Sequence, residues 1–496
     1  MNCFVISDLL GRNSITSLVS VAFVGRFLGR VFTYGMYLYV GRSLGPDVLG
    51  AFTAGLIVLQ FGGAISQVGT RATVQKYIPI HREAGETSRL TGVVLFSLLA
   101  SVGVGTVLAL VLYSTRGVLA PYVGREILTA AGVLLFGIPL WAFHNVGESA
   151  TLAFKRTKYA VYIRDFARSG SAVLFVLIAS IVSPTLIGLS VAYLGALVVA
   201  CLVTVVILVR LGAFAEFRSP SLNLEEVARY SASVLPQSIS GPVTRWGDIL
   251  VLTLFVTTTQ IGWYQSAYQT AILLLFAAVS INSVFPPLAS DLYSRGESEM
   301  LETLSSLATK WASVLTLFAT IYVVVFRQEV LGLFGPSYVT AEYVLVVLAL
   351  GRAVKAMTGP VGFLLSMTEY ERFELWNGIG GAVLNIALNL ALVPEYGLMG
   401  AAVATSVTLG LVNVIRLLEV RRYLGFWTYS FDQLSSVVPL AVAAGAMLIV
   451  QQTVPGPAVV SLVVGGVVSF PVFVALLFFV SVDDEDRLLL RSVEDI

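Results

Sequence analysis

The sequence predicts an all-α, polytopic membrane protein, and three observations support this fold class. Of the 496 residues, 57% are apolar and only 12% are charged, and the mean hydropathy is +0.88. Soluble domains carry roughly a quarter charged residues. Apolar runs of membrane-spanning length recur from end to end, with short loops between them. The net charge of +1 gives no indication of a nucleic-acid partner, and we expect none.

Fourteen segments are apolar and long enough to cross a membrane, which takes about 20 residues. Turn residues such as Gly45-Pro46 and Ser183-Pro184 separate them, so we expect no domain outside the membrane. In chain order the predicted helices are 15–40, 48–75, 90–113, 127–152, 160–182, 187–209, 230–256, 260–290, 303–326, 341–367, 375–393, 398–418, 433–452 and 458–481.

The first helix is unusual because its apolar run contains Arg26 and Arg30. An arginine at the bilayer centre costs roughly 2.5 to 3.5 kcal/mol on insertion scales, so both side chains should face a polar interior. Their spacing of four places them on one helical face. We expect this face to line a cavity for an anionic substrate. The alternative is a pair of interhelical arginines bonded to carbonyls or to an acid.

Basic residues predict the orientation in the membrane. Most loop arginines and lysines, including those of 155–168, fall on one side of the predicted topology. The opposite side receives only Arg42, Arg116, Arg125 and Arg327. Because basic loops stay in the cytoplasm, both termini are predicted to be cytoplasmic.

The two halves of the chain repeat. Leu49-Gly50-Ala51-Phe52 aligns with Ile261-Gly262-Trp263-Tyr264 at an offset of 212, and Thr157-Lys158-Tyr159 aligns with Thr368-Glu369-Tyr370 at 211. Each repeat holds an even number of predicted helices, so both would have the same orientation.

This repeat divides the chain into three parts. We predict a six-helix lobe over residues 1–211 and a second, parallel six-helix lobe over 212–424. Residues 425–496 would add two transmembrane helices and an acidic cytoplasmic tail.

These features resemble a known family. The chain has six plus six predicted helices with a trailing pair, and arginines in the first helix. It also has the Leu-Gly-Pro-x-x-x-Gly-x-Phe turn of Leu44–Phe52, Gln67-Val68-Gly69 and Lys76-Tyr77. In these features it resembles the polysaccharide transport branch of the multidrug/oligosaccharidyl-lipid/polysaccharide (MOP) exporter superfamily. The resemblance implies a MATE-like fold with two lobes around a central cavity, and alternating access. It also implies a substrate of sugars on an undecaprenyl or dolichyl phosphate or diphosphate.

The seventh helix carries a candidate site. Pro236 and Gly241-Pro242 interrupt it shortly before Arg245 and Asp248. Interrupted helices often mark transporter sites, because freed backbone groups must face a cavity or protein. Arg245 would join the anion site, and Asp248 would bind H⁺ or Na⁺. Alternatively the two side chains simply neutralise each other.

Cations recur in the tenth helix, where Arg352 and Lys355 share a face before Gly359-Pro360. Together with the first and seventh helices, they predict a positive cavity. Such a cavity suits a phosphorylated glycolipid and disfavours cationic drugs.

Two further candidates lie near the predicted cytoplasmic ends of the second and fourth helices. Arg71 is a candidate gate residue, and Glu148 is a candidate for ion coupling or for the same gate. The alternative is that both are interfacial side chains. His144, one turn from Glu148, could relay protons, but a lone histidine is more often structural.

Amide and aromatic side chains are candidates for binding the glycan. Gln265 and Gln269 share one face of the eighth helix, with Tyr268 beside them. The alternative is interhelical hydrogen bonding, which we favour for Asn385 and Asn389 of the eleventh helix.

The sequence does not indicate an enzyme. It contains no P-loop, His81 and His144 lie apart, and Cys3 and Cys201 form neither a metal motif nor a disulfide framework. We expect no cofactor and no metal centre, apart from coupling to Na⁺ or H⁺.

The expected function is therefore transport. The chain would flip a polyprenyl-phosphate-linked oligosaccharide across the cytoplasmic membrane of a prokaryote, for cell-surface polysaccharide or glycoprotein synthesis. We expect a monomer among membrane lipids, working with glycan-assembly enzymes. The first alternative is an ion-coupled multidrug antiporter of the same superfamily. A membrane glycosyltransferase or ligase would need a larger external loop, and a scaffold would leave the buried cations unexplained.

Overall fold

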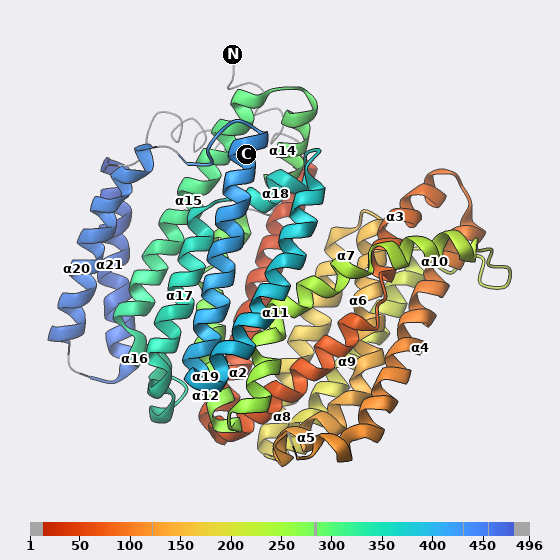
Figure 1. The fold of residues 1–496 in the computed structure, drawn as a ribbon, viewed down its shortest axis with the longest axis horizontal. Coiled ribbons are helices and arrows are strands. Elements are labelled where there is room, and N and C mark those ends of the chain that lie inside the picture. Colours follow the sequence, from red (N-terminus) through yellow and green to blue (C-terminus); the bar gives the residue numbers. More distant parts are fainter. Residues whose placement is uncertain (1–12, 122, 282–284, 430, 455, 481–496) are drawn as a thin grey trace. The chain divides into compact units, whose positions relative to one another are not determined.

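The computed structural model describes residues 13–121, 123–281, 285–429, 431–454 and 456–480 (Figure 1). Throughout these residues the chain forms helices and short connections, without a β-strand. The predicted all-α fold class is confirmed.

The first part of the chain contains one very long helix and a series of shorter ones. In chain order they are α2 (Asn13–Ile65), α3 (Thr70–Glu83), α4 (Thr87–Leu119), α5 (Arg125–Leu134), η1 (Leu135–Gly137), α6 (Ile138–Ala153), α7 (Thr157–Val161), η2 (Tyr162–Gly170), α8 (Ser171–Val182), α9 (Leu186–Arg210), α10 (Leu224–Ser233) and α11 (Leu235–Phe255).

The second part contains several broken helices and a second very long one. In chain order they are α12 (Thr258–Leu273), α13 (Phe276–Ile281), α14 (Phe285–Ser294), α15 (Ser298–Val325), α16 (Arg327–Gly332), η3 (Pro336–Ala341), α17 (Glu342–Met357), α18 (Val361–Ser366), α19 (Glu371–Tyr423), η4 (Phe431–Ser436), α20 (Val437–Thr453) and α21 (Ala458–Val480).

The described residues form two compact units. Unit 1 takes those within Met1–Phe23, Ser266–Gly381 and Ala402–Ile496, and unit 2 takes Val24–Gln265 and Ala382–Ala401. The lobes predicted over residues 1–211 and 212–424 stay a prediction.

Long apolar helices make the chain a multi-pass membrane protein. Within the described residues, nine helical segments are long and apolar enough to cross a membrane. The longest, α19, has 53 residues, or about 80 Å at 1.5 Å per residue, whereas the apolar core is about 30 Å thick. It bends at Gly397 (φ 55°), and α2 bends at Gly45 (φ 85°), just before Pro46. The count of fourteen spans stays a prediction.

The core of unit 2 is built around α6, whose residues 144–151 are all buried. This helix packs against α3, α4 and α9. A Cβ atom on Gly147 would lie 2.2 Å from the side chain of Thr204, so α6 and α9 touch with almost no side chain between them. The polar side chains of α6 are therefore held inside a close-packed bundle.

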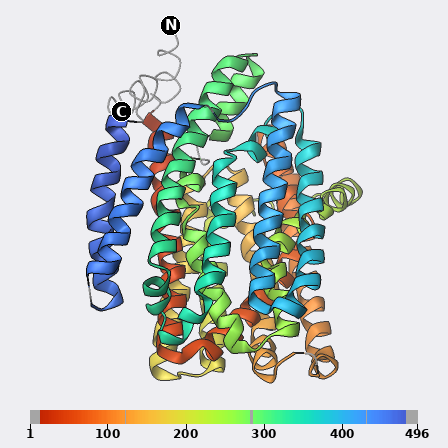
Figure 2. The same cartoon turned by 60° about the vertical axis from the view of Figure 1, so that its left-hand side comes forward.

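In unit 1 the last two helices, α20 and α21, run side by side and α20 packs on α15 (Figure 2). The rings of Phe318 and Phe473 stack with centroids 4.4 Å apart. Gln451 Nε2 donates a hydrogen bond to the carbonyl oxygen of Val325 at 2.7 Å. The C-terminal pair is thus fixed to α15 by rings and by a side-chain hydrogen bond.

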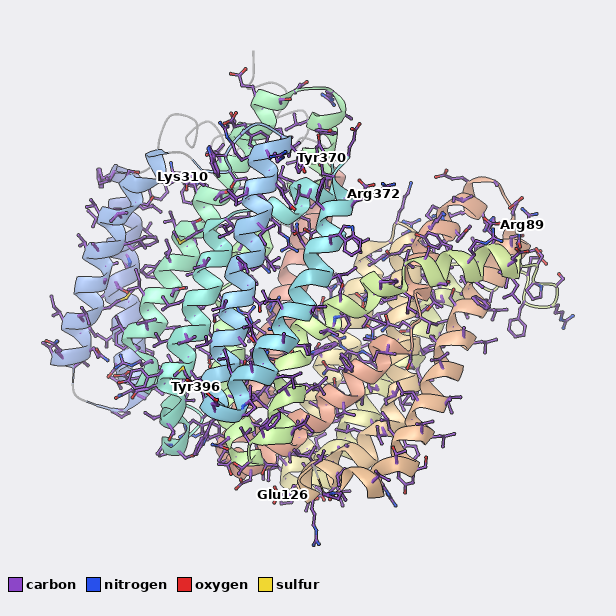
Figure 3. The ribbon with its side chains drawn as sticks, viewed as in Figure 1. Arg89, Glu126, Lys310, Tyr370, Arg372 and Tyr396 are labelled. Atoms are coloured by element: carbon purple, nitrogen blue, oxygen red, sulfur yellow. The ribbon has the colours of Figure 1, made fainter. Side chains whose placement is uncertain are left out.

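The two ends of unit 2 differ in chemistry. Figure 3 shows Arg89 at one end, beside α3 and α10, and Glu126 at the other, at the start of α5. At the first end His81 Nδ1 and Arg89 both contact the carboxylate of Glu86, at 2.8 and 3.1 Å. At the second end Thr258 Oγ1 donates a hydrogen bond to Glu126 at 2.8 Å.

Candidate functional site

The two repeated turns meet at the Glu126 end of unit 2. A Cβ atom on Gly50 would lie 1.8 Å from the carbonyl oxygen of Thr258, and one on Gly262 would lie 2.2 Å from the carbonyl oxygen of Pro46. Only glycine permits such an approach of two backbones. Gly50 and Gly262 are 212 residues apart, as are Pro46 and Thr258, which is the offset predicted from the sequence.

A hydrogen bond between the turns has the same spacing. The hydroxyl of Thr259 donates to the Asp47 carboxylate, across 212 residues. We call this contact between 46–50 and 258–262 the glycine junction. Each turn thus contributes a glycine that approaches a carbonyl oxygen of the other turn.

A group of charged side chains lies in the interior half of unit 2, and we call it the basic cluster. The charge of Arg71 is close enough to interact with those of three other arginines and of Glu148. Arg71 itself is exposed, and its Nε donates to Ser149 Oγ at 2.9 Å. The cluster consists of Arg71, Arg164, Arg168 and Arg245, with Glu148 and Asp165.

Arg164 is the centre of a buried ion-pair network. Its Nε and Nη2 donate to the two carboxylate oxygens of Asp165 at 3.0 and 2.8 Å, and its Nη1 donates to Glu148 Oε1 at 3.3 Å. The carboxylate side chains are only 6% and 8% exposed, against 26% for Arg164. Every guanidinium nitrogen of Arg164 is therefore bonded to a carboxylate. These bonds fix the positions of the two acids.

A π-helix positions three of these residues. The η2 segment has the wider i→i+5 turn and carries Arg164, Asp165 and Arg168 toward the cluster. Tyr162 and Phe166, which alternate with them, are 47% and 46% exposed on the other face. π-turns are rare and frequently occur at functional sites, so this one marks the cluster.

Arg168 is held over an aromatic ring. Its guanidinium carbon lies 5.0 Å from the ring centroid of Trp141, a cation–π contact. A guanidinium also carries a planar fork of N–H donors, of the kind that binds phosphate.

The helix that carries the predicted Arg26 and Arg30 touches this network. A Cβ atom on Gly29 would lie 2.8 Å from Asp165 Oδ1, so α2 packs closely against the buried acid. Arg30 is half-buried one residue further on. The side chain of Arg26 lies outside the described residues.

Asp248 on α11 lies in a second polar region of unit 2. It is 2% exposed, and its Oδ2 accepts a hydrogen bond from the buried Tyr264 hydroxyl at 2.6 Å. A Cβ atom on Gly247 would lie 3.4 Å from Asn385 Oδ1, which brings α19 alongside. Within the described part, the side-chain oxygens of Asn389 and Gln265 are buried without a hydrogen-bond partner.

The remaining predicted residues belong to unit 1. The guanidinium of Arg352 lies 5.4 Å from the ring centroid of Tyr268, so the structure brings these two together. Lys355 is close enough to Glu374 for their charges to interact. Gln269, on the same helix as Tyr268, is half-buried.

Sequence reasoning placed Arg71, Glu148 and Arg245 among the candidates, and the structure brings these three together. It missed Arg164, Asp165 and Arg168 as site residues, because it used the basic ones only to predict orientation. A signal was present, since Arg164-Asp165 and Arg168 fall at a spacing of four inside a segment predicted to be a transmembrane helix.

Comparisons with known proteins identify relatives of this chain. The chain is 25% identical over 405 residues to the "Probable low-salt glycan biosynthesis flippase Agl15" of Haloferax volcanii, covering 78% of this chain and 80% of that one. It is 27% identical over 242 residues to the "Probable flippase AglR" of the same organism, covering 48% and 49%.

Solved structures share the fold. The "Lipid II flippase MurJ" has a TM-score of 0.72 at 14% identity, covering 92% of this chain and 98% of that one. An inward-facing MATE transporter of the MOP superfamily has a TM-score of 0.67 at 17% identity, covering 82% and 98%. Residues 15–292, more than half of the chain, match the family described as "Polysaccharide biosynthesis protein". The chain therefore belongs to the family described as "Polysaccharide biosynthesis protein", and it has the MATE- and MurJ-like fold.

Proposed function

We propose that this flippase moves a polyprenyl-phosphate-linked oligosaccharide across the cytoplasmic membrane by alternating access, for cell-surface polysaccharide or glycoprotein synthesis. The observation that carries the proposal is the basic cluster. The charge of Arg71 interacts with those of Arg164, Arg168 and Arg245, and Arg164 is bonded to the buried carboxylates of Glu148 and Asp165. A concentration of guanidinium groups of this kind suits an anionic head group.

The phosphate would bind where the cluster is most accessible. Each guanidinium nitrogen of Arg164 is already bonded to Glu148 or Asp165, whereas Arg71 and Arg245 are exposed and Arg168 is half-buried. Charge-assisted N–H···O bonds to a phosphate are stronger than neutral ones, and a guanidinium donates two at once. We therefore assign the phosphate head to Arg71, Arg168 and Arg245, and assign Arg164, Glu148 and Asp165 to positioning. Glu148, proposed from the sequence for ion coupling, would act here through its bond to Arg164.

Other residues would complete the substrate site. We propose that Arg26, Arg30, Arg352 and Lys355 contribute further positive charge, as the sequence suggests. Tyr268, with Gln265 and Gln269, would contact the sugars, since amides bond hydroxyls and an aromatic face accepts an apolar ring face. The contact of Arg352 with Tyr268 supports this assignment, because it joins a cation and an aromatic ring in one place.

Coupling to an ion gradient would involve Asp248. Its carboxylate is buried and bonded to the Tyr264 hydroxyl, and the side-chain oxygen of Asn385 lies beside its helix; hard cations take oxygen ligands of these kinds. The proposal is that Asp248 binds Na⁺ or H⁺ during each cycle. The orientation with both termini in the cytoplasm, the monomeric state and cooperation with glycan-assembly enzymes remain parts of the proposal that follow from the sequence.

Leaflet-resolved transport tests the function. The purified full chain would be reconstituted in liposomes with a fluorescent polyprenyl phosphodiester of a disaccharide, and the outer-leaflet fraction would be followed by its accessibility to a membrane-impermeant glycosidase. We expect rapid movement of this lipid and none of a cationic dye. Movement of the dye but not of the glycolipid would favour the multidrug antiporter instead.

A further inference from the structure

His144 is a buried titratable group that the proposed transport mechanism does not yet use. It lies on α6 with 0% exposure, and within the described residues neither ring nitrogen has a hydrogen-bond partner. Leaving a polar group buried and unsatisfied costs about 1–3 kcal/mol, so such a group calls for an explanation. The position of His144 beside the basic cluster offers an explanation.

Three arginines act on this ring. The charges of Arg71 on α3 and of Arg164 and Arg168 on η2 all interact with His144. The Trp141 ring, whose centroid is 6.3 Å from that of His144, is also the ring that Arg168 covers. Two of these three arginines, Arg71 and Arg168, are ones to which we assign the phosphate head.

The other neighbouring elements add little charge. Along α6 itself the acid is Glu148, one turn away and already bonded to Arg164, which also binds Asp165. The helices α4 and α9, which pack on α6, carry charged side chains only near their ends, at Arg89, Arg116 and Arg210. Tyr193 of α9 is neutral and interacts with Arg168. The net field on the ring is positive as long as no anion is bound.

An anion bound to these arginines would offset the positive field on the His144 ring. A proton on His144 is opposed by the guanidinium charges, and a phosphate that pairs with them removes that opposition. Linkage is reciprocal, so a proton on the ring would strengthen anion binding by the same factor.

We propose that His144 is a proton-binding site linked to the basic cluster: the imidazole accepts a proton when a phosphate head binds and releases it when the head leaves. The proton comes from the surrounding water and is bound at the free ring nitrogen, with no other bond made or broken. This inference rests on the proposed function, because it requires the cluster to bind a phosphate.

The chain offers a direct test, since His81 and His144 are its two histidines. The full chain, with ring-¹⁵N-labelled histidine, would be studied by NMR in detergent micelles between pH 5.5 and 7.5. The probe is octyl glucosyl phosphodiester, whose charge is constant in this range, unlike a phosphomonoester with a pKa near 6. His81→Gln removes the other signal, so His144 is assigned without altering it. We expect an imidazolium signal from His144 at pH 6 only with the probe present.

Affinity gives a second readout. The probe should bind roughly tenfold more tightly at pH 5.5 than at pH 7.5, within the usual range of coupling energies. His144→Gln should abolish this dependence, and His81→Gln should leave it intact.

The outcomes separate the two proposals. If the probe binds and Arg168→Ala weakens it, but His144 stays neutral, the proton linkage is wrong and the anion site stands. An imidazolium signal that is the same with and without probe also overturns the linkage. If the probe does not bind at any pH, the anion site itself is wrong, and the linkage falls with it.

Discussion

Unit 1 and unit 2 each contain a group of charged side chains, and the two groups differ in how their arginines are bonded to acids. In unit 1 Arg416 donates to Glu374 at 2.6 Å and Asn377 donates to Glu419. Lys355 interacts with the same Glu374, so two cations face two acids. In unit 2 Arg164 bonds to both Glu148 and Asp165, and the charges of Arg164, Arg168 and Arg245 interact with that of Arg71.

The difference distinguishes charged side chains that pair with one another within the fold from charged side chains that we propose to bind a ligand. A buried ion pair that is balanced adds little net stability, although breaking it by removing one partner is costly. The unit 1 group fits this description and ties the two halves of α19 together. In the unit 2 group Arg164 is bonded to both acids, whereas Arg71 and Arg245 are exposed and Arg168 is half-buried. Cations that an anionic ligand can reach in this way are the reason for proposing a binding site here.

The largest effect should come from removing Arg164. Arg164→Ala leaves the carboxylates of Glu148 and Asp165 buried without a partner, and should lower the free energy of unfolding by about 3 kcal/mol. Thermal unfolding in detergent measures this loss. A decrease under about 1 kcal/mol would show that Arg164 does not hold the two acids.

Removing Arg416 should have a similar but smaller effect. Arg416→Ala exposes the partly buried Glu374, with an expected loss of about 2 kcal/mol of unfolding free energy. Because the unit 1 group is balanced, binding of the octyl glucosyl phosphodiester should change by less than about twofold. A large loss of binding in this variant would contradict the contrast between the units.

Arg168 should affect function more than stability. Arg168→Ala should slow glycolipid transport about tenfold, equivalent to 1.4 kcal/mol, because one of the proposed phosphate donors is lost. The matched control is Arg116→Ala. Arg116 also lies over a ring, 4.0 Å from the centroid of Tyr113, but outside the cluster.

Both variants should lose less than about 1 kcal/mol of stability, the range of an exposed cation–π contact. Equal transport by the two variants would remove Arg168 from the site.

The smallest effect is expected at the Arg89 end of unit 2. A hydrogen bond from His81, helped by Arg89, holds the pKa of Glu86 below the ordinary range of a glutamate. A lowered pKa means that the carboxylate adds stability at neutral pH, and that this contribution is lost as the pH falls through the folded-state pKa. Wild type should therefore lose slightly more stability below pH 4.5 than Glu86→Gln, as measured by thermal unfolding against pH. Parallel curves would exclude this contribution.

The sequence was sufficient for the fold class and for part of the site. Composition and apolar runs predicted the helices, because the bilayer imposes both length and polarity on them. Arg71, Glu148 and Arg245 were found because each is an ionisable group in or beside an apolar run.

Arg164 and Arg168 were not found, for a physical reason. Near the end of a predicted span, an arginine that marks orientation and one that faces a polar interior look the same in sequence. What distinguishes them is the π-turn of η2, which directs Arg164 and Arg168 to one side and Tyr162 to the other. The turn packs against α9, and Arg164 and Arg168 reach Glu148 and Trp141 of α6, which are contacts between distant parts of the chain that no local pattern of the sequence records.

The glycine junction has one more consequence. The approach of Gly50 to Thr258 and that of Gly262 to Pro46 are copies of one contact, and the Asp47–Thr259 hydrogen bond lies between them. The two turns are therefore joined at two equivalent points and not at one, so the junction resists a twist about either point as well as separation. The repeat of the sequence is in this way also a repeat of the contact that holds the turns together.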